Sequence, residues 1–356
     1  MPSKLLLGID ASRSIHPKPT GVERYSTEII RALLQEWKGE VRLYTPKTIA
    51  EFPEKKQKLL WAPRFWSVLR LSLEMLLHKP DLLFVPAHVL PFFAPVRSFV
   101  MIHDIAFEKI PKAYGSNARR YLRWSTRRAV RKAQTVLVPS EAVKADLMHF
   151  YKIDEARVTV IPHGPLSLDL PLKAGPRAKE PLFFYLGRLE AKKNLGVLLD
   201  AFAIVQKKYS MARLVLAGRS GFGWKEWEVK AQKQKGVDLP GFLDEKKVAD
   251  LYARATAFVF PTLEEGFGFP LLQAFQAGCP VLCSDLAVLR EVGGDAVLYA
   301  DPKDTRAFAK AMLQLIDEPE HMAILSLKGK KRLEQFSWEK AAKSLVLLFN
   351  GSNALK

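Results

Sequence analysis

The sequence has few cysteines, no long uninterrupted hydrophobic run and a shortage of acidic residues, and each of these excludes a class of protein. Its 356 residues include only two cysteines, Cys279 and Cys283. Two thiols can neither build a disulfide framework for a chain of this length nor complete a zinc site, so we expect the reducing cytoplasm. Lys and Arg number 55 against 37 Asp and Glu, a net charge of +18. This excess predicts an anionic partner but does not distinguish nucleic acid, membrane and phosphorylated substrate.

No segment has the pattern of an export signal or a membrane-spanning helix. The most apolar stretch, 82–102, is interrupted by three prolines and an arginine, whereas a spanning helix needs about 20 consecutive apolar residues. The apolar run within residues 1–10 is too short for a signal-peptide core. We therefore expect a soluble protein that lies at most on the inner face of the cytoplasmic membrane.

Metal-binding patterns are missing as well. None of the seven histidines stands four residues from another. The adjacent acids at 154–155 and 264–265 lack the set of partner carboxylates that Mg²⁺ or Mn²⁺ requires. We expect neither a metal nor a cofactor.

Short β-branched or Leu-rich runs alternate with longer helical patterns, which is typical of parallel sheets covered by helices. In the first half the expected strands are 5–9, 41–44, 82–85, 99–102, 135–138 and 158–161, and the expected helices are 22–36, 119–133 and 141–150. In the second half the expected strands are 182–186, 213–217, 257–260 and 281–283, and the expected helices are 195–208, 246–254, 270–277 and 338–349. Prolines and glycines without periodicity predict a linker over 164–181.

This order predicts an α/β protein with two doubly wound domains, since a domain usually has about 100–200 residues. We expect one domain over 1–165 and a second over 166–337, and the apolar face of the last helix, about 338–356, predicts that this helix packs against the rest of the chain. Ligands of doubly wound sheets bind at the carboxyl ends of the strands. The site is therefore expected in a central cleft that the two domains face.

Seven basic residues without an intervening acid form the densest charge cluster. They are Arg119, Arg120, Arg123, Arg127, Arg128, Arg131 and Lys132. Spacings of three and four place several of them on one helical face. The cluster is either a solvated face or a surface for anionic lipid headgroups or a charged acceptor.

Two loops that follow expected strands carry residue types suited to a phosphorylated ligand. In the first loop, 187–194, Arg188 and Lys193 offer the planar fork and the point charge that bind phosphate oxygens. In the second loop, 261–270, glycines precede a helix start whose free N–H groups attract anions, and Glu265 offers an acceptor for sugar hydroxyls. The alternative is that neither loop binds a ligand, the first being a basic surface loop and the second an acidic loop with ordinary turn glycines.

Together these segments resemble the retaining glycosyltransferases of the GT-B fold in family 4 (glycosyltransferase group 1), and in particular its mannosyltransferases. The resemblance rests on an ordered set of short motifs along nearly the whole chain. They are TGVERY (20–25), HDIAF (103–107), VPSE (138–141), VIPHG (160–164), GRLEAKKN (187–194), GFLD (241–244), EEGFGFPLLQAFQAGCPVLCSD (264–285) and GGDA (293–296).

The resemblance implies that the domain over 1–165 binds the acceptor, that a last helix, about 338–356, crosses back to it, and that the domain over 166–337 binds the nucleotide-sugar donor. It also implies a role for each matching position. Arg188 and Lys193 would bind the donor diphosphate, and Glu265 would hold the hydroxyls of the donor sugar. His103 would face that sugar, and Gly21 would let the first loop approach the phosphates or the acceptor. The other donor-binding positions would be Leu243 beside the base and Gly266, Phe267, Gly268, Phe269, Pro270, Leu271 and Gln273 around the helix start.

Two positions depart from the family pattern. Gln273 stands where the family has a second acid, so a hydrogen bond to the ribose would survive without its charge and weaken by about 1 kcal/mol. Glu23 stands where many relatives have a small residue, and an acid near phosphates is unfavourable unless it points away.

The resemblance implies a metal-independent hexosyltransferase that acts with retention on a saccharide or lipid-linked acceptor in cell-surface polysaccharide or lipopolysaccharide synthesis. We expect GDP-mannose as the donor rather than a UDP-hexose, because HDIAF, GRSGFGW (218–224) and GGDAVLYADP (293–302) look most like mannosyltransferases. No carboxylate pair is available for a double displacement, so the departing diphosphate would itself take the acceptor's proton. The alternatives are an inactive GT-B-like protein and a basic nucleic-acid-binding protein. We expect no nucleic-acid partner, since the sequence has no zinc-finger spacing or RNA-binding strand signature.

Overall fold

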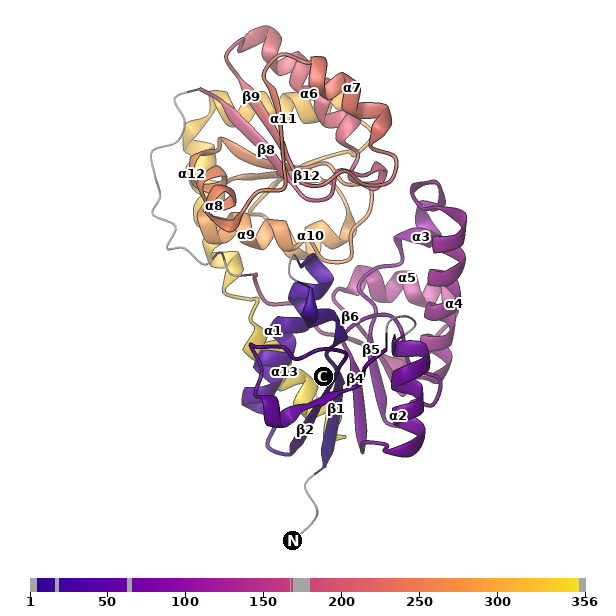
Figure 1. Cartoon of the computed structure of the whole chain (residues 1–356). Coiled ribbons are helices and arrows are strands. Elements are labelled where there is room, and N and C mark those ends of the chain that lie inside the picture. The colour runs from indigo at the N-terminus through magenta and orange to yellow at the C-terminus, as the bar shows by residue number, and fades with distance from the viewer. Residues whose placement is uncertain (1–4, 17–18, 63–65, 167, 169–179, 352–356) are drawn as a thin grey trace. The chain divides into compact units, whose positions relative to one another are not determined.

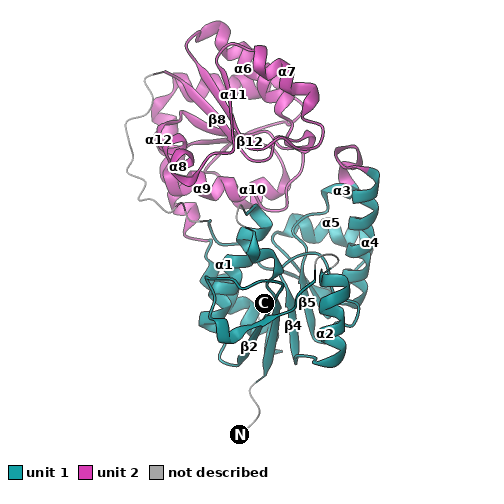
Figure 2. Ribbon diagram, viewed as in Figure 1, with its two compact units in different colours: residues 1–108, 116–166, 336–356 teal, residues 109–115, 167–335 magenta. Residues whose placement is uncertain are grey.

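In a computed structural model the chain forms two compact units, and the structure describes residues 5–16, 19–62, 66–166, 168 and 180–351. Unit 1 comprises residues 1–108, 116–166 and 336–356, and unit 2 comprises residues 109–115 and 167–335 (Figure 2). Most of the expected linker 164–181 lies outside the described residues. Among the described residues, no helix combines the length and the apolar character that crossing a bilayer requires.

Unit 1 is built on a seven-stranded parallel sheet in the order β3-β2-β1-β4-β5-β6-β7 (Figure 1). Its strands are β1 (Leu6–Asp10), β2 (Glu40–Thr45), β3 (Gln57–Leu59), β4 (Leu82–Val85), β5 (Ser98–Met101), β6 (Thr135–Val138) and β7 (Val158–Val160). Its helices are α1 (Gly21–Glu36), α2 (Leu71–Leu77), α3 (Ala106–Lys109, whose last residue groups with unit 2), α4 (Ser116–Lys132), α5 (Glu141–Tyr151) and α13 (Trp338–Phe349). The central strands β4, β5 and β6 are buried at every residue, as strands covered on both faces must be.

The last helix, α13, returns to unit 1 and packs against α1. Its final residue, Phe349, is fully buried and its ring lies 4.7 Å from that of Phe99 and 5.8 Å from that of Phe84. The sequence expectation of a packed helix that crosses back is therefore confirmed.

Unit 2 is built on a six-stranded parallel sheet in the order β10-β9-β8-β11-β12-β13. Its strands are β8 (Leu182–Leu186), β9 (Arg213–Ala217), β10 (Val237–Gly241), β11 (Ala257–Phe260), β12 (Val281–Ser284) and β13 (Leu298–Ala300). Its helices are α6 (Leu195–Lys208), α7 (Lys225–Lys233), α8 (Glu245–Arg254), α9 (Phe269–Ala277), α10 (Ala287–Gly293), α11 (Thr305–Asp317) and α12 (Pro319–Leu333). The chain builds β8, β9 and β10 outward in one direction and then starts β11 on the other side of β8. The carboxyl ends of β8 and β11 therefore flank the switch point at which such sheets bind ligands.

Most expected elements are confirmed to within one or two residues at each end, or three for the start of α4, but the sequence prediction missed several. The missed strands, β3, β10 and β13, all lie at an edge of their sheet. An edge strand buries less of its surface, and β10 contains Pro240 and no fully buried residue, so its sequence lacks the apolar run that indicates a central strand.

Candidate active site

The two loops with phosphate-binding residue types begin at neighbouring strand ends in unit 2. The first loop, 187–194, leaves β8 and leads into α6, and the second, 261–268, leaves β11 and leads into α9. Since β8 and β11 are hydrogen-bonded neighbours, both loops lie at the switch point of the sheet.

Hydrogen bonds tie the two loops together across about 70 residues of sequence. The Leu263 amide donates to the Lys192 carbonyl at 2.8 Å, and the Thr262 hydroxyl donates to the same carbonyl at 3.2 Å. The Asn194 side chain donates to the Pro261 carbonyl at 3.1 Å. Asn194 has a φ of 56°, a left-handed conformation that asparagine tolerates better than most residues. The loops therefore form one rigid structure.

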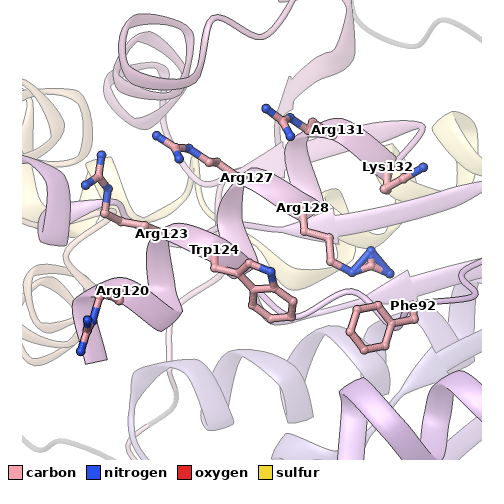
Figure 3. A pocket seen from close by; sticks show the side chains of 8 residues that line it. All are labelled: Phe92, Arg120, Arg123, Trp124, Arg127, Arg128, Arg131 and Lys132. Atoms are coloured by element: carbon pink, nitrogen blue, oxygen red, sulfur yellow. The ribbon is translucent and has the colours of Figure 1, made fainter. Parts of the chain in front are cut away.

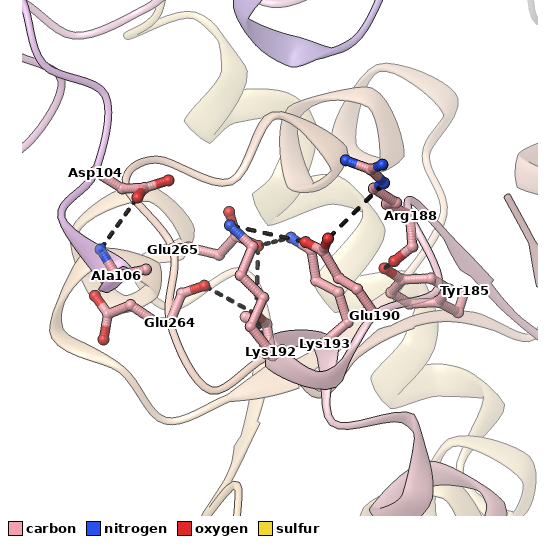
Figure 4. Close-up of polar contacts among 10 residues, drawn as sticks. Asp104, Ala106, Tyr185, Arg188, Glu190, Lys192, Lys193, Glu264 and Glu265 are labelled. Carbon is pink, nitrogen blue, oxygen red and sulfur yellow. Dashed lines mark hydrogen bonds and ion pairs between the residues drawn. The ribbon is translucent and has the colours of Figure 1, made fainter. Parts of the chain in front are cut away.

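Lys193 and Glu265 form an ion pair between the loops (Figure 4). Their side chains are only 11% and 14% exposed. The Lys193 ammonium also lies 5.1 Å from the centre of the Phe260 ring, and the Thr262 hydroxyl lies 3.3 Å from the Glu265 carboxylate. The cation expected to bind phosphate and the acid expected to bind sugar thus neutralise each other in this structure, and an anionic ligand would compete for Lys193.

Arg188 is placed differently from Lys193, because 66% of its side chain is exposed. Among the described residues its closest acid is Glu190, whose carboxylate lies 3.9 Å from the Arg188 Nε, and this leaves the guanidinium open to an anion (Figure 4). The Arg188 carbonyl accepts a hydrogen bond of 2.9 Å from the Tyr185 hydroxyl. Burial raises the pKa of that hydroxyl, so Tyr185 stays a neutral donor that holds the backbone of the loop.

A third loop, 218–224, is joined to the first loop by backbone hydrogen bonds. The Leu189 amide donates to the Arg219 carbonyl at 2.8 Å, and the Gly221 amide donates back to the Leu189 carbonyl at 2.6 Å. A Cβ atom at Gly218 would lie 1.7 Å from the Gly187 carbonyl oxygen. Residue 218 must therefore be glycine for the first loop to keep this path.

In the sequence the third loop appears only as the motif GRSGFGW, which favours GDP-mannose as the donor, and none of the expected site residues lies in it. Arg219 at the end of β9 and Phe242 at the end of β10 are both exposed, and the guanidinium lies 4.8 Å from the ring centre. Phe242 directly precedes Leu243, the expected neighbour of the base, which is half-buried. The signal that could have pointed to Arg219 is a glycine at a strand end followed by a second glycine three residues later.

The start of α9 holds most of the other expected donor-binding residues. Gly268 is the N-cap residue with a φ of 100°, and Pro270 occupies the first turn. Leu271 is fully buried, and its amide donates to the Gly268 carbonyl at 3.0 Å, so this amide is already satisfied within the chain. Gln273 is 6% exposed, which leaves little of its side chain open to a ribose. Gly266 and Phe269 belong to the same segment, and Phe267 is buried.

Unit 1 contains the remaining expected site residues, Gly21 and His103. Gly21 is the first residue of α1, and the Glu23 carboxylate accepts a hydrogen bond of 2.8 Å from the Thr20 amide. Glu23 therefore caps its own helix, which explains how an acid is accommodated in the first loop.

His103 follows β5, and its ring is buried, with 8% exposure. Its Nε2 lies 2.9 Å from the Pro86 carbonyl oxygen, and its Nδ1 lies 3.3 Å from Nε2 of His163. Burial lowers the pKa of His103 to about 3 and holds the pKa of His163 well below its usual value.

These shifts predict that the protein loses stability in mild acid. Below pH 6.5 the unfolded chain binds protons at both histidines, whereas the folded chain keeps His103 neutral down to about pH 3 and keeps His163 neutral well below its usual pKa. The free energy of unfolding therefore falls as pH falls. Each histidine contributes up to about 1.4 kcal/mol per pH unit. Urea unfolding of the wild type at pH 7 and pH 5 measures this loss.

In the double variant His103→Gln and His163→Gln the free energy of unfolding should depend less on pH. His149→Gln, at an exposed position, serves as the control. An equally steep dependence in the double variant would show that other groups are responsible.

The basic cluster lies on α4, where part of it has a structural role. Arg119 and Arg123 form ion pairs with the buried carboxylate of Glu108 at 3.6 and 2.9 Å. The Arg128 guanidinium lies 4.6 Å from the centre of the Phe92 ring. A cavity of about 560 Å³ opens beside the helix (Figure 3). It is lined by Phe92, Arg120, Arg123, Trp124, Arg127, Arg128, Arg131 and Lys132.

Among the described residues, no group of three or more His, Cys, Asp or Glu side chains lies close enough together to hold a metal ion. Independence from metal stays a prediction.

Comparison with known proteins places these features in a family. Residues 170–332 match the family model for glycosyl transferases group 1, and residues 19–164 match the model for glycosyltransferase family 4. The O-antigen chain mannosyltransferase B of Escherichia coli is 28% identical over 258 residues, which are 68% of this chain and 67% of that protein. The O-antigen chain mannosyltransferase RfbU of Salmonella typhimurium is 25% identical over 264 residues, 72% of this chain and 70% of that protein. Among solved structures, WaaG, a glycosyltransferase involved in lipopolysaccharide biosynthesis, superimposes with a TM-score of 0.77 at 14% identity over 98% of this chain and 100% of that one.

Proposed function

This chain belongs to the family 4 glycosyltransferases (glycosyl transferases group 1) and has their GT-B fold, and from that premise we propose that it transfers mannose from GDP-mannose. The acceptor is a saccharide or lipid-linked saccharide of cell-surface polysaccharide or lipopolysaccharide synthesis. The relatives named as O-antigen mannosyltransferases support this choice. The observation that carries the proposal is the gathering of Arg188, Lys193 and Glu265 on two tied loops at the switch point of unit 2.

The proposed reaction proceeds with retention and without a metal. The bond between the sugar C1 and the β-phosphate oxygen breaks, and the acceptor oxygen bonds to C1 from the same face. The acceptor's proton passes to the departing phosphate. Arg188 and Lys193 stabilise the negative charge that grows on that phosphate. Electrostatic stabilisation of this kind is usually the largest single contribution to catalysis. Glu265, released from Lys193, accepts hydrogen bonds from the sugar hydroxyls.

The pair Arg219 and Phe242 supports a guanine nucleotide. An arginine fork matches the O6 and N7 acceptors of guanine, and an exposed aromatic ring gives a base a stacking surface. The two residues follow the adjacent strands β9 and β10, and Phe242 directly precedes Leu243.

We therefore expect Arg219→Ala and Phe242→Ala each to weaken GDP binding about tenfold, the value of one stacking or base contact. Binding of UDP should change less in Arg219→Ala, whereas the loss of stacking in Phe242→Ala should weaken the binding of both nucleotides. The measurement is the rise in melting temperature with GDP and with UDP, and Phe222→Ala, another exposed ring of the third loop, is the control. A larger rise with UDP than with GDP in the wild type would identify a UDP-hexose donor instead.

A transfer assay with a panel of nucleotide sugars tests the activity itself. Release of GDP from GDP-mannose, with or without an added acceptor, supports the proposal. Nucleotide binding without turnover of any donor would favour the inactive alternative, to which Gln273 lends some weight.

We also propose that the basic surface of α4 contacts the anionic inner face of the cytoplasmic membrane. Its cavity combines cations with two aromatic rings, and no acid lines it among the described residues. Basic residues with exposed aromatic side chains are typical of proteins that lie on anionic bilayers. Trp124 and Phe92 are 42% and 47% exposed.

Charge reversal tests this contact. We expect the triple variant Arg127→Glu, Arg131→Glu and Lys132→Glu to lose sedimentation with vesicles that contain phosphatidylglycerol. These three residues are exposed and have no acidic partner among the described residues, so their charges are available to lipid headgroups. Arg123 is left intact because it pairs with Glu108. Lys207→Glu, Lys233→Glu and Lys235→Glu together make the same change in net charge on unit 2 and serve as the control. Equal sedimentation of both triple variants and wild type would leave α4 as a solvated helix.

A further inference from the structure

Buried rings from several segments of unit 1 surround the imidazole of His103. Tyr25 of α1 meets it edge-on with ring centres 4.7 Å apart, and His163, which follows β7, lies 5.4 Å away. Tyr25 is fully buried and His163 is 1% exposed. The space in which the two imidazoles meet is thus shielded from bulk solvent.

The hydrogen bonds of His103 determine where its hydrogen is. Its Nε2 lies 2.9 Å from the Pro86 carbonyl oxygen, and a carbonyl oxygen only accepts, so Nε2 carries the hydrogen. A neutral imidazole has a single N–H, which leaves a lone pair on Nδ1. His163 Nε2, at 3.3 Å from that lone pair, must therefore be the donor.

The surroundings keep both rings neutral. Burial is the main cause of the lowered pKa of His103, the nearby His88 and Arg13 lower it further, and only the Pro86 carbonyl and Asp104 oppose them. For His163, burial and the neighbouring His103 both lower the pKa, and only a hydrogen bond with the Ile161 backbone opposes them. A second hydrogen on either ring would bring an unscreened charge into this space.

His163 is itself held in place by the start of α13. The Trp338 ring stacks on it at an angle of 16° and its Nε1 donates to the Pro165 carbonyl at 2.8 Å. A Cβ at Gly164 would lie 2.5 Å from the Trp338 amide nitrogen. The helix that returns to unit 1 therefore fixes the donor of this hydrogen bond.

We infer that His163 is a positioning residue: it donates to the Nδ1 lone pair of His103 and, together with the Pro86 carbonyl, holds the neutral ring in place with its hydrogen on Nε2. A ring held in this way has no proton to release and no free lone pair. His103 therefore acts through its fixed position and not as a general acid or base. The link to catalysis rests on the proposed function, whereas the tautomer does not.

Nuclear magnetic resonance of the ¹⁵N-labelled histidine rings tests the tautomer without any donor. We expect His103 to show a lone-pair Nδ1 and a protonated Nε2 with no titration between pH 5 and 8, its signals being identified by their loss in His103→Gln. In His163→Leu, Nδ1 loses its donor while the Pro86 carbonyl still keeps the hydrogen on Nε2, so the ¹⁵N signal of Nδ1 should shift to that of a lone pair without a hydrogen bond. We expect kcat to fall about tenfold, the effect of one unsatisfied buried acceptor. In His163→Gln the side-chain amide can donate to Nδ1, so the Nδ1 signal should return towards its wild-type position and kcat to within about threefold of wild type.

The outcomes separate this inference from the proposed function. A protonated Nδ1, or a titration of His103 near pH 6.5, overturns the inference whether or not the protein transfers sugar. A loss of kcat in His163→Leu with the Nδ1 signal unchanged also overturns it, because His163 would then act only through packing. If no donor is turned over, the proposed function fails and the spectra still decide the tautomer.

Discussion

Arg188→Ala and Lys193→Ala each lower kcat by about 100-fold or more, the expected cost of removing a fixed positive charge from a site where negative charge develops. The measurement is the steady-state rate of nucleoside diphosphate release from the donor. KM should change less than kcat, because the charge on the diphosphate grows as the glycosidic bond breaks.

The two variants should differ in stability. The Arg188 side chain is 66% exposed, so its removal should leave the melting temperature unchanged. Lys193 is the partner of Glu265, and both are largely buried. Removing Lys193 leaves a carboxylate unpaired in a poorly solvated place, which is destabilising.

The double variant Lys193→Ala and Glu265→Gln separates these effects. It should regain the melting temperature lost in Lys193→Ala, since no unpaired charge remains, but not the activity. Arg254→Ala, which removes an exposed cation of α8, is the control for a general loss of positive charge. Near wild-type kcat in Arg188→Ala or Lys193→Ala would contradict the proposed diphosphate clamp.

Gly218→Ala should destabilise unit 2 by about 3 kcal/mol or more, at the upper end of the cost of overpacking. The added methyl group would lie 1.7 Å from the Gly187 carbonyl oxygen, and a backbone atom cannot turn aside as a side chain can. To accept the methyl group the first loop must move away from the third, which displaces Arg188. We therefore expect activity to be lost together with stability, measured by thermal unfolding and by donor turnover.

Gly241→Ala is the matched control for this prediction. Gly241 also has a positive φ, of 71°, but nothing lies within 4 Å of its added Cβ. It should therefore show only the strain of a left-handed residue, roughly 1–2 kcal/mol. Equal destabilisation by the two variants would mean that backbone strain, and not the contact with Gly187, makes glycine necessary at 218.

Features that depend on neighbours in sequence could be predicted from the sequence. The strands 182–186, 213–217 and 257–260 and the helices 195–208 and 338–349 begin and end in the structure where the hydrophobic pattern indicates. The Ser140 side chain accepts from the Val143 amide as an N-cap should. The two active-site loops could also be located, because each lies between a buried strand and a helix start.

The edge strands and the third loop could not be found in the same way. The edge strand β10 owes its place to pairing with β9, and its own residues do not show the pattern of a buried strand. Arg219 becomes a candidate site residue only because its carbonyl meets the Leu189 amide and its side chain meets Phe242.

The sequence by itself determined which segments are strands and helices and which loops carry cations, acids and glycines, because these depend on periodicity and residue type within a few positions. Only the tertiary structure decided that Lys193 pairs with Glu265, 72 residues away, and that His103 meets His163, 60 residues away. Such contacts depend on the order of strands within each sheet, which is selected by the packing of the whole unit and leaves no local pattern in the sequence.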